Sequence, residues 1–168
     1  MIGSLLYMYR RWKTKFYTKK VSKRCKSVGT GLKVNGPSSV FGTVELGDNV
    51  NFNGMSIRGA GRCVIGNNFH SGINCAILTS NHNYQGSKIP YDGEMIKKEV
   101  VIGDQVWIGD NVLILGGAKI DEGAIIQAGS VVVGHIPPLS IAGGNPAKVF
   151  KTRDADHYYR LKEEGKFM

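Results

Sequence analysis

The feature that most constrains this chain is a large apolar residue that recurs every six positions. The longest uninterrupted run consists of Ile102, Ile108, Ile114, Ile120, Ile126 and Val132. Two earlier runs keep the same spacing, one over residues 28–52 and one over residues 65–77. A period of six is neither the 3.6 of an α-helix nor the 2 of an isolated strand. Repeats of this length are typical of a chain wound into a parallel β-helix.

Each repeat unit follows an Ile-Gly-x-x-small-x pattern, which is clearest in residues 102–106 and 108–112. The large aliphatic residue and the small residue four positions later are expected to point inward. Gly, Asn and Asp between them suit a corner, because these residue types tolerate a positive φ. Three units make one triangular coil of 18 residues, and coils stack at the strand spacing of about 4.8 Å. The sequence therefore predicts an all-β domain over residues 27–150, built as a prism of stacked coils.

The six-residue spacing is broken twice. Ile65 follows Phe52 by 13 positions, one more than two units, which predicts a bulge near residues 57–62. Ile102 follows Ile77 by 25 positions, again one more than whole units allow. This second interval predicts a loop over residues 81–99 that leaves the coil. After Val132, the Pro-Pro pair at residues 137–138 is expected to end the prism.

The positive charge of the chain is confined to one end. Nine of the 22 Lys and Arg residues lie in residues 1–26, and that segment contains no Asp or Glu. The remaining residues are neutral, so the formal net charge of +9 belongs to this segment. Nucleic-acid binding is disfavoured, because no reader motif accompanies the basic residues. Residues 151–168 are polar and charged, and they predict a short helical tail.

Residues 1–26 predict a basic amphipathic helix. Its apolar stripe consists of Leu5, Tyr9, Trp12 and Phe16. One reading is that this stripe covers the open end of the β-helix and so protects the strands at that end from pairing with other strand edges. The other is that the helix lies on an anionic membrane. The sequence contains no run of about 20 apolar residues, so it predicts no membrane-spanning helix. Its first residues are a poor match to a signal peptide.

Three cysteines, Cys25, Cys63 and Cys75, form neither a metal-ligand spacing nor an even disulfide set. Cys75 falls on an inward position, where a small core residue is expected. This usage fits a reducing compartment. The expected location is the cytoplasm, with peripheral attachment to the inner face of the membrane if the basic helix binds lipid.

Four segments of the chain resemble the hexapeptide-repeat acyltransferases: IGDQVWIGDN at 102–111, AGSVVV at 128–133, IPP at 136–138 and GNPAK at 144–148. Residues 65–80 are similar to the galactoside/maltose O-acetyltransferase branch and its polysaccharide-modifying relatives. The resemblance covers about residues 40–150. It implies a left-handed parallel β-helix, an exception to the usual right-handed crossover. It also implies a homotrimer with active sites between adjacent prisms, acetyl-CoA as co-substrate, no metal, and a sugar or polysaccharide precursor as acceptor.

The resemblance also implies roles for particular residues. His82, at the start of the predicted loop, matches the catalytic histidine, and an imidazole suits a base that deprotonates a hydroxyl near neutral pH. Asn74, Trp107 and Tyr84 are the expected contacts of the reacting groups and the acceptor. Corner packing for Asn74 and plain packing for Trp107 are the alternatives.

Six residues are expected to bind acetyl-CoA. Gly109, Asp110 and Ala128 match positions along the pantetheine arm, with Asp110 and Ala128 one coil apart. Lys148 and Lys151 match basic residues that meet the nucleotide phosphates. Gly134 and the preceding Val133 stand where relatives often carry a Thr-Lys pair. One expected contact to the phosphates of acetyl-CoA therefore differs in this chain.

Three alternatives are weighed against this reading. A zinc carbonic anhydrase needs three converging histidines, whereas His70 and His82 fall on different sides of a coil and His135 lies far along the prism. A structural, non-catalytic β-helix predicts regular Thr or Ser ladders and no projecting loop. Within the enzyme class, N-acetylation of an amino sugar or an antibiotic is the alternative to transfer onto a hydroxyl.

Overall fold

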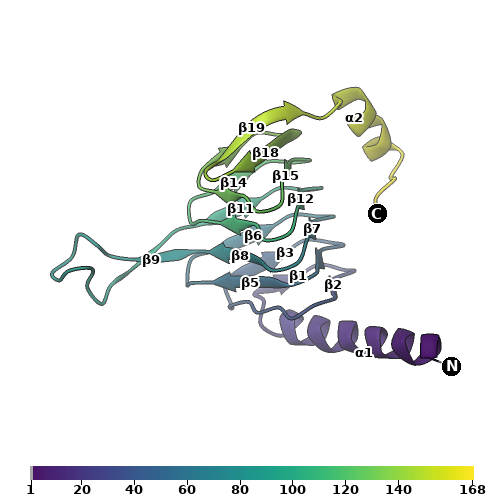
Figure 1. Ribbon diagram of the computed structural model, residues 1–168, viewed down its shortest axis with the longest axis horizontal. Coiled ribbons are helices and arrows are strands. Elements are labelled where there is room, and N and C mark those ends of the chain that lie inside the picture. Colours follow the sequence, from purple (N-terminus) through teal and green to yellow (C-terminus); the bar gives the residue numbers. More distant parts are fainter. Residues whose placement is uncertain (1) are drawn as a thin grey trace.

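The computed structural model describes the backbone of residues 2–168 and the side chains from Leu5 onward. The chain runs from an N-terminal helix through a prism of stacked coils to a short C-terminal helix (Figure 1). The prism has three faces, each a sheet whose strands come from successive coils. These faces are called the first, second and third face below, in the order in which the chain visits them.

The first face contains β1 (Ser27–Val28), β3 (Val44–Leu46), β6 (Cys63–Ile65), β11 (Val100–Ile102), β14 (Lys119–Ile120) and β17 (His135–Ile136). The second face contains β2 (Lys33–Val34), β4 (Asn51–Phe52), β7 (His70–Ser71), β12 (Trp107–Ile108), β15 (Ile125–Ile126), β18 (Ser140–Gly144) and β19 (Ala147–Thr152). The third face contains β5 (Met55–Arg58), β8 (Cys75–Leu78), β13 (Leu113–Ile114) and β16 (Val131–Val132).

Strand pairing confirms the predicted coil length. Trp107 pairs with Ile125 on the second face and Leu113 with Val131 on the third, in both cases 18 residues apart and parallel. The extra residue of the first interruption lies in the corner after β5, where Gly59 has a φ of 102°. Every residue of the Ile102–Val132 run is buried, with at most 1% of its surface exposed. The six-residue repeat therefore builds one continuous core along the prism axis.

Polar residues fill the corners as the pattern predicts. A left-handed backbone, with φ between 52° and 56°, occurs at Asn49, Asn68, Asn74, Gln105 and Asn111. Aspartates of the Gly-Asp pairs tie one coil to the next; the Asp104 carboxylate, for example, accepts a hydrogen bond from the backbone N–H of Asn67 at 2.7 Å. At the corners, side chains thus take the place of water as hydrogen-bond partners of backbone groups that would otherwise be unpaired.

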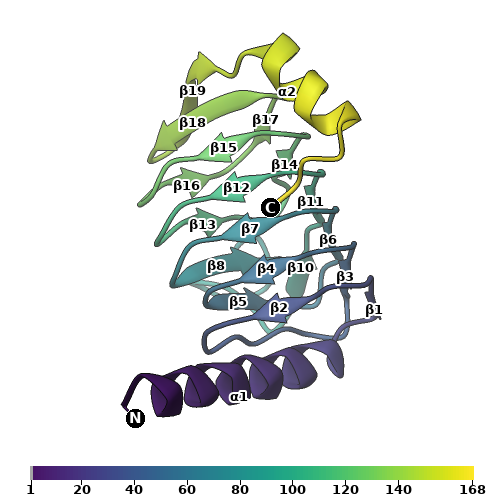
Figure 2. The same ribbon diagram turned by 90° about the vertical axis from the view of Figure 1, so that its right-hand side faces the viewer.

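The helix α1 (Ile2–Ser22) lies across the open end of the prism beside β2 (Figures 1 and 2). Val21 is buried against the core, Tyr17 packs beside it, and the Thr18 hydroxyl accepts a hydrogen bond from the Val34 N–H at 3.0 Å. Of the two readings given for residues 1–26, one placed this helix over the open end of the prism, and the structure has it there. The predicted contact surface was wrong, because Leu5, Tyr9, Trp12 and Phe16 remain exposed. Among residues 2–168, no helix is both long enough and apolar enough to cross a membrane.

The opposite end differs from the sequence prediction in one respect. The coils continue past the Pro-Pro pair, since β18, which follows it, still pairs in parallel with β15. The antiparallel strand β19 then folds back along β18 and contains Lys151, so the helical part of the tail is shorter than predicted. It is α2 (Ala155–Glu163), which begins after Asp154, whose side chain accepts a hydrogen bond from the His157 N–H.

The second interruption projects from the prism between β8 and β11 (Figure 1). Its base is a two-stranded antiparallel ladder of β9 (Ser80–His82) and β10 (Met95–Lys97), in which His82 pairs with Met95. The sequence predicted a loop here, and the structure shows a hairpin with a long tip. This ladder provides hydrogen-bond partners for the backbone N–H and C=O groups of a segment that has left the coil.

Candidate functional site

His82 lies at the end of β9, on the projecting hairpin, with its side chain exposed. Its imidazole stacks on the ring of Tyr91, with ring centroids 3.9 Å apart and planes inclined by 16°. Tyr84, at the hairpin tip, is 71% exposed. The predicted base is therefore held away from the prism and steadied by a ring of its own hairpin. Tyr91 was missed by the sequence reasoning.

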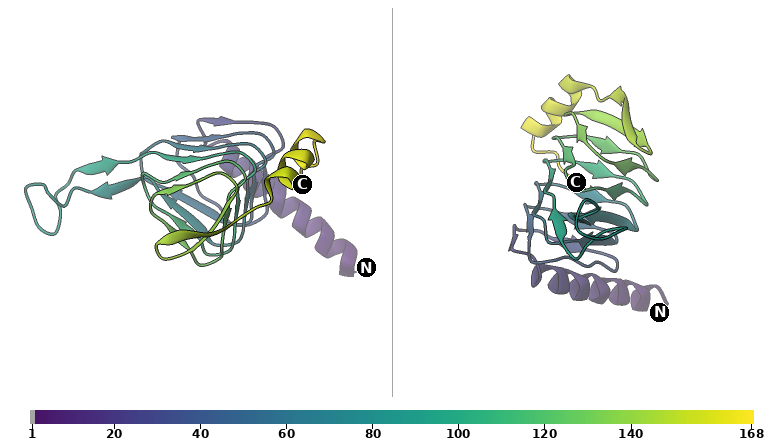
Figure 3. Two further views of the ribbon diagram at one scale, coloured as in Figure 1. Left: turned by 90° about the horizontal axis from the view of Figure 1, so that it is seen from above. Right: turned by 90° about the vertical axis from the view of Figure 1, so that its left-hand side faces the viewer.

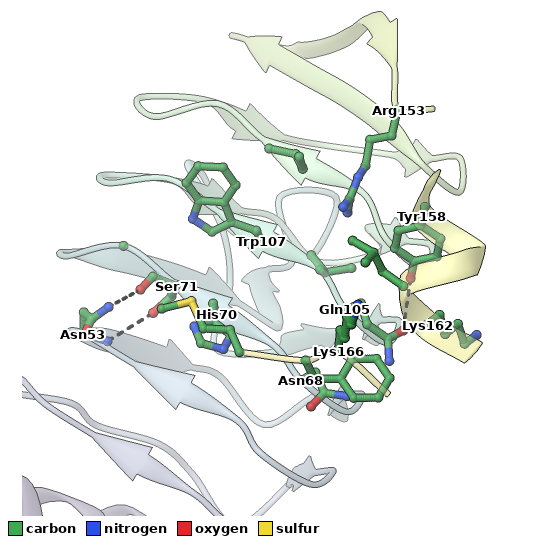
Figure 4. Close-up of a pocket in the computed structure, with 16 residues that line it drawn as sticks. Asn53, Asn68, His70, Ser71, Gln105, Trp107, Arg153, Tyr158, Lys162 and Lys166 are labelled. Atoms are coloured by element: carbon green, nitrogen blue, oxygen red, sulfur yellow. Dashed lines mark hydrogen bonds between the residues drawn. The ribbon is translucent and has the colours of Figure 1, made fainter. Parts of the chain in front are cut away.

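Trp107 lies on the other side of the molecule. Its ring projects outward from β12 on the second face and is 55% exposed (Figure 4). The hairpin leaves the prism at the edge between the third and first faces, and the second face lies opposite this edge (Figures 2 and 3). Within one chain the structure does not bring His82 and Trp107 together.

Beside Trp107 there is a cavity of about 630 Å³ between the second face, α2 and the last residues of the chain. Its lining includes Trp107, His70, Asn53 and Ser71 from the second face (Figure 4). The Asn53 side chain is fixed by a hydrogen bond from its Nδ2 to the Ser71 carbonyl oxygen, 2.7 Å long. The cavity thus combines one large aromatic ring with polar groups of set orientation, as ligand sites commonly do.

His70 is the least expected member of this lining. Its Nε2 atom is buried and has no hydrogen-bond partner among the described residues. Burial lowers the pKa of His70 below its usual value, and the positive charge of Lys33 acts in the same direction, while a backbone contact from Met168 partly opposes them. The imidazole is therefore neutral at pH 7. The sequence placed His70 on a coil but carried no signal of this burial.

The outer wall of the cavity is basic and is anchored to the prism by two residues. The Tyr158 hydroxyl donates a hydrogen bond to the Glu122 carboxylate, 3.0 Å away, and also lies 3.2 Å from the side-chain oxygen of Gln105. The Arg153 guanidinium lies over the Tyr158 ring and donates to the Gly123 carbonyl oxygen at 3.0 Å. Lys162 and Lys166, from α2 and the residues after it, add positive charge to the same wall.

Asn74, Gly109 and Asp110 lie at the edge between the second and third faces. Asn74 has a φ of 54° and its Nδ2 donates to the Asn111 Oδ1 at 2.8 Å, which matches the corner alternative stated for it. The Asp110 carboxylate accepts from the Ile73 N–H at 2.8 Å. A Cβ on Gly109 would lie 2.6 Å from the backbone nitrogen of Ala128, so the two coils approach too closely there for any other residue. These residues have structural roles that do not exclude ligand contacts.

The other residues predicted to bind acetyl-CoA are spread over the prism. Ala128 shares the edge of Gly109 and Asp110, whereas Gly134 lies at the edge from which the hairpin projects. Lys148 and Lys151 are both exposed on β19, at the end of the prism opposite α1. One chain therefore does not gather these six residues into a single pocket.

Comparisons with known proteins agree with this architecture. Residues 99–134 match the family described as bacterial transferase hexapeptide (six repeats). A galactoside acetyltransferase in complex with coenzyme A superposes with a TM-score of 0.71 at 29% identity, covering 82% of this chain and 70% of the other. Residues 99–134 are therefore identified as hexapeptide repeats. The match also confirms the predicted left-handed parallel β-helix.

Two further structures resemble this chain. A maltose O-acetyltransferase from Clostridium difficile 630 superposes with a TM-score of 0.61 at 29% identity, covering 79% of this chain and 68% of the other. The N-acyltransferase AntD from Bacillus cereus gives a TM-score of 0.63 at 18% identity, covering 88% of this chain and 95% of the other, which shows the shared fold alone. Among curated proteins, none matches the sequence.

The zinc alternative requires a cluster of metal ligands. Within residues 2–168, no group of three or more His, Cys, Asp or Glu side chains is arranged to hold a metal ion. His70 lies in the cavity, His82 on the hairpin and His135 on the first face, where its Nε2 is 2.6 Å from the Asp121 carboxylate. These three histidines therefore lie in separate parts of the structure.

Proposed function

We propose that this protein is an acetyl-CoA-dependent O-acetyltransferase that acts on a sugar hydroxyl, with a saccharide of surface-polysaccharide assembly as the acceptor. The observation that carries the proposal is the position of His82 on the hairpin, which projects from the prism on the side opposite the second face (Figure 3), the face that carries Trp107 and the cavity. The similarity to a galactoside acetyltransferase and a maltose O-acetyltransferase supports the reaction class and the sugar acceptor.

In this proposal the active site lies between protomers. The hairpin of one prism presents His82 to the second face of the next prism, where Trp107 is exposed. Three such contacts form a closed ring by cyclic symmetry, which gives a homotrimer. The large exposed ring of Trp107 supports this arrangement, because apolar surface of this kind on a soluble domain commonly marks a contact with a ligand or partner.

His82 is the proposed general base. Its imidazole takes the proton of the acceptor hydroxyl while the oxygen attacks the carbonyl carbon of the acetyl thioester. A C–O bond forms, the C–S bond breaks, and the leaving thiolate of coenzyme A takes up the proton from His82. Backbone N–H groups stabilise the oxyanion of the tetrahedral intermediate. The products are an acetylated sugar and free coenzyme A, with no acetylated enzyme on the way.

The Trp107 cavity is the proposed acceptor site, with Tyr84 of the incoming hairpin as an additional contact and Asn74 near the reacting groups. Aromatic rings bind the apolar face of a sugar, and Asn53 and Ser71 supply hydrogen-bonding groups beside it. The proposed donor site follows the edge that contains Gly109, Asp110 and Ala128. In this arrangement the phosphates of acetyl-CoA meet Lys148 and Lys151.

Replacement of the proposed base tests the reaction. His82→Ala is expected to lower kcat by about 10²–10⁴-fold, the usual contribution of a general base. The matched control is His157→Ala, since His157 is an exposed histidine on α2, away from the hairpin. Release of coenzyme A from acetyl-CoA is measured with sugars, nucleotide sugars, polysaccharide repeats and amino sugars as acceptors. Full turnover by a folded His82→Ala oligomer would contradict the proposal, and a strict requirement for a free amine would assign N-acetylation instead.

A further inference from the structure

The outward face of α1 carries an aromatic stripe with no partner among the described residues. The exposed fractions of Leu5, Tyr9, Trp12 and Phe16 are 73%, 56%, 61% and 51%. The three rings stack along the helix, with centroids 6.3 Å apart between Tyr9 and Trp12 and 5.7 Å apart between Trp12 and Phe16. The stripe is therefore one continuous apolar surface along the helix, which distinguishes it from scattered exposed apolar residues.

The stripe faces away from the prism. The helix contacts the prism through Thr14, Tyr17, Thr18 and Val21. At 3.6 residues per turn, the middle of this contact surface lies about 160° around the helix from the middle of the stripe. The N-terminal part of α1 also extends beyond the prism (Figures 1 and 3). No other part of the described chain can therefore cover the stripe without moving the helix.

Positive charge surrounds this surface. Lys15 and Lys19 flank the stripe on one side of the helix, and Lys13 and Lys20 flank it on the other. Of the nine basic residues in residues 1–26, only Lys26 forms an ion pair within the described part of the chain, with Glu45. The exposed helix is thus apolar along its centre and cationic along both margins.

We propose that α1 docks the protein on an anionic lipid surface. The aromatic stripe would lie at the boundary between headgroups and acyl chains, and the flanking lysines would reach the lipid phosphates. Charge complementarity favours lipid over a second copy of this chain, because two copies of this face would bring like charges together. The inference depends on the structure of α1 and not on the transfer reaction.

Docking in this way sets the height of the hairpin above the lipid. Since α1 lies across the end of the prism, the coils stack away from the surface to which α1 binds (Figure 2). The hairpin leaves after the third coil, which is roughly 15 Å above α1 at the spacing of stacked strands. His82 is then close enough to the lipid surface to reach a saccharide that is attached to a lipid.

Vesicle sedimentation of the full chain tests the docking. We expect binding to vesicles of phosphatidylcholine with phosphatidylglycerol, little binding to phosphatidylcholine alone, and weakening by salt. Lys15→Gln with Lys19→Gln should weaken binding about thirty-fold, because each basic residue contributes about 1 kcal/mol near an anionic surface. Tyr9→Ser with Trp12→Ser should weaken it by on the order of tenfold or more, through lost apolar burial.

The control variant is Phe150→Ser, which removes a 61% exposed ring from β19 at the opposite end of the prism and should bind as the unaltered chain does. All variants should keep acetyl transfer to a soluble acceptor, so failure of the docking and failure of the proposed function are distinguishable. Equal binding to both vesicle types, or undiminished binding by the stripe variant, would overturn the proposal. Self-association in the absence of lipid that Trp12→Ser abolishes would overturn it in favour of a second copy.

Discussion

At the scale of single residues, the stacking of His82 on Tyr91 is the contact with the clearest chemical consequence. The two rings are nearly parallel, and both belong to the projecting hairpin, outside the packed core. The ring of Tyr91 therefore restricts the orientation of an imidazole that few other groups surround. We assign Tyr91 a positioning role, since it acts through His82.

Tyr91→Ala should lower kcat about fivefold and leave KM for acetyl-CoA nearly unchanged, because an aromatic pair contributes about 1 kcal/mol. Tyr91→Phe keeps the ring and should restore most of the lost kcat. Steady-state kinetics of both variants measure this split. Equal losses in the two variants would show that the hydroxyl, and not the stacking, is what matters.

At the scale of elements, adjacent strands of the first face are joined by a ladder of charges. The Arg62 guanidinium, beside β6, lies 2.9 Å from the Glu45 carboxylate of β3 and 2.7 Å from the Glu99 carboxylate beside β11. Lys26 adds a contact to Glu45 at 3.0 Å. These hydrogen bonds, first from Arg62 and then from Lys26, lower the pKa of Glu45 to about 2. The ladder connects three coils through side chains that face solvent.

The lowered pKa of Glu45 predicts a pH-dependent contribution to stability. An unfolded glutamate has a pKa of about 4.3, so the stabilisation is complete above that pH and is lost as the pH falls toward 2. Glu45→Gln should unfold at a lower urea concentration than the unaltered chain at pH 7. The difference is expected to be small, as for other exposed ion pairs, and to be mostly lost at pH 2. A difference of the same size at both pH values would contradict this explanation.

Much of the fold follows from the repeat, because each inward position is fixed by a side chain that must leave water. The positions of Ile102 to Val132, the 18-residue coil and the two interruptions were all predictable for this reason. The contact surface of α1 was not. Its apolar periodicity identifies the aromatic stripe, whereas Tyr17 and Val21 make the contact because they lie where the chain enters the first coil.

The site was predictable only in part. His82 and Trp107 could be named from the sequence, because His82 begins an interruption of the repeat and both residues match positions of the family that the chain resembles. The burial of His70 and the stacking of Tyr91 depend on contacts between segments, which no spacing in the sequence reveals. Asn74 and Asp110 show the opposite case, since the repeat alone accounts for their corner positions.

At the scale of the whole molecule, the proposed catalytic groups lie on opposite sides of one prism. His82 projects from one edge, and Trp107 lies on the face opposite that edge (Figures 2 and 3). In the proposed mechanism, a protein of this shape performs the reaction only if a neighbouring protomer completes the site. The proposed mechanism therefore requires assembly as well as the individual residues.

The most direct test is activity in mixed oligomers. His82→Ala lacks the base, and Trp107→Glu places a charge on the proposed acceptor face, so each variant alone should be inactive. When the two are unfolded together in equal amounts and refolded, about a quarter of the sites in a cyclic trimer receive an intact His82 from one protomer and an intact Trp107 from the next. We predict recovery of about that share of the unaltered activity, measured as coenzyme A release. Mixed oligomers that form and remain inactive would contradict a site shared between protomers.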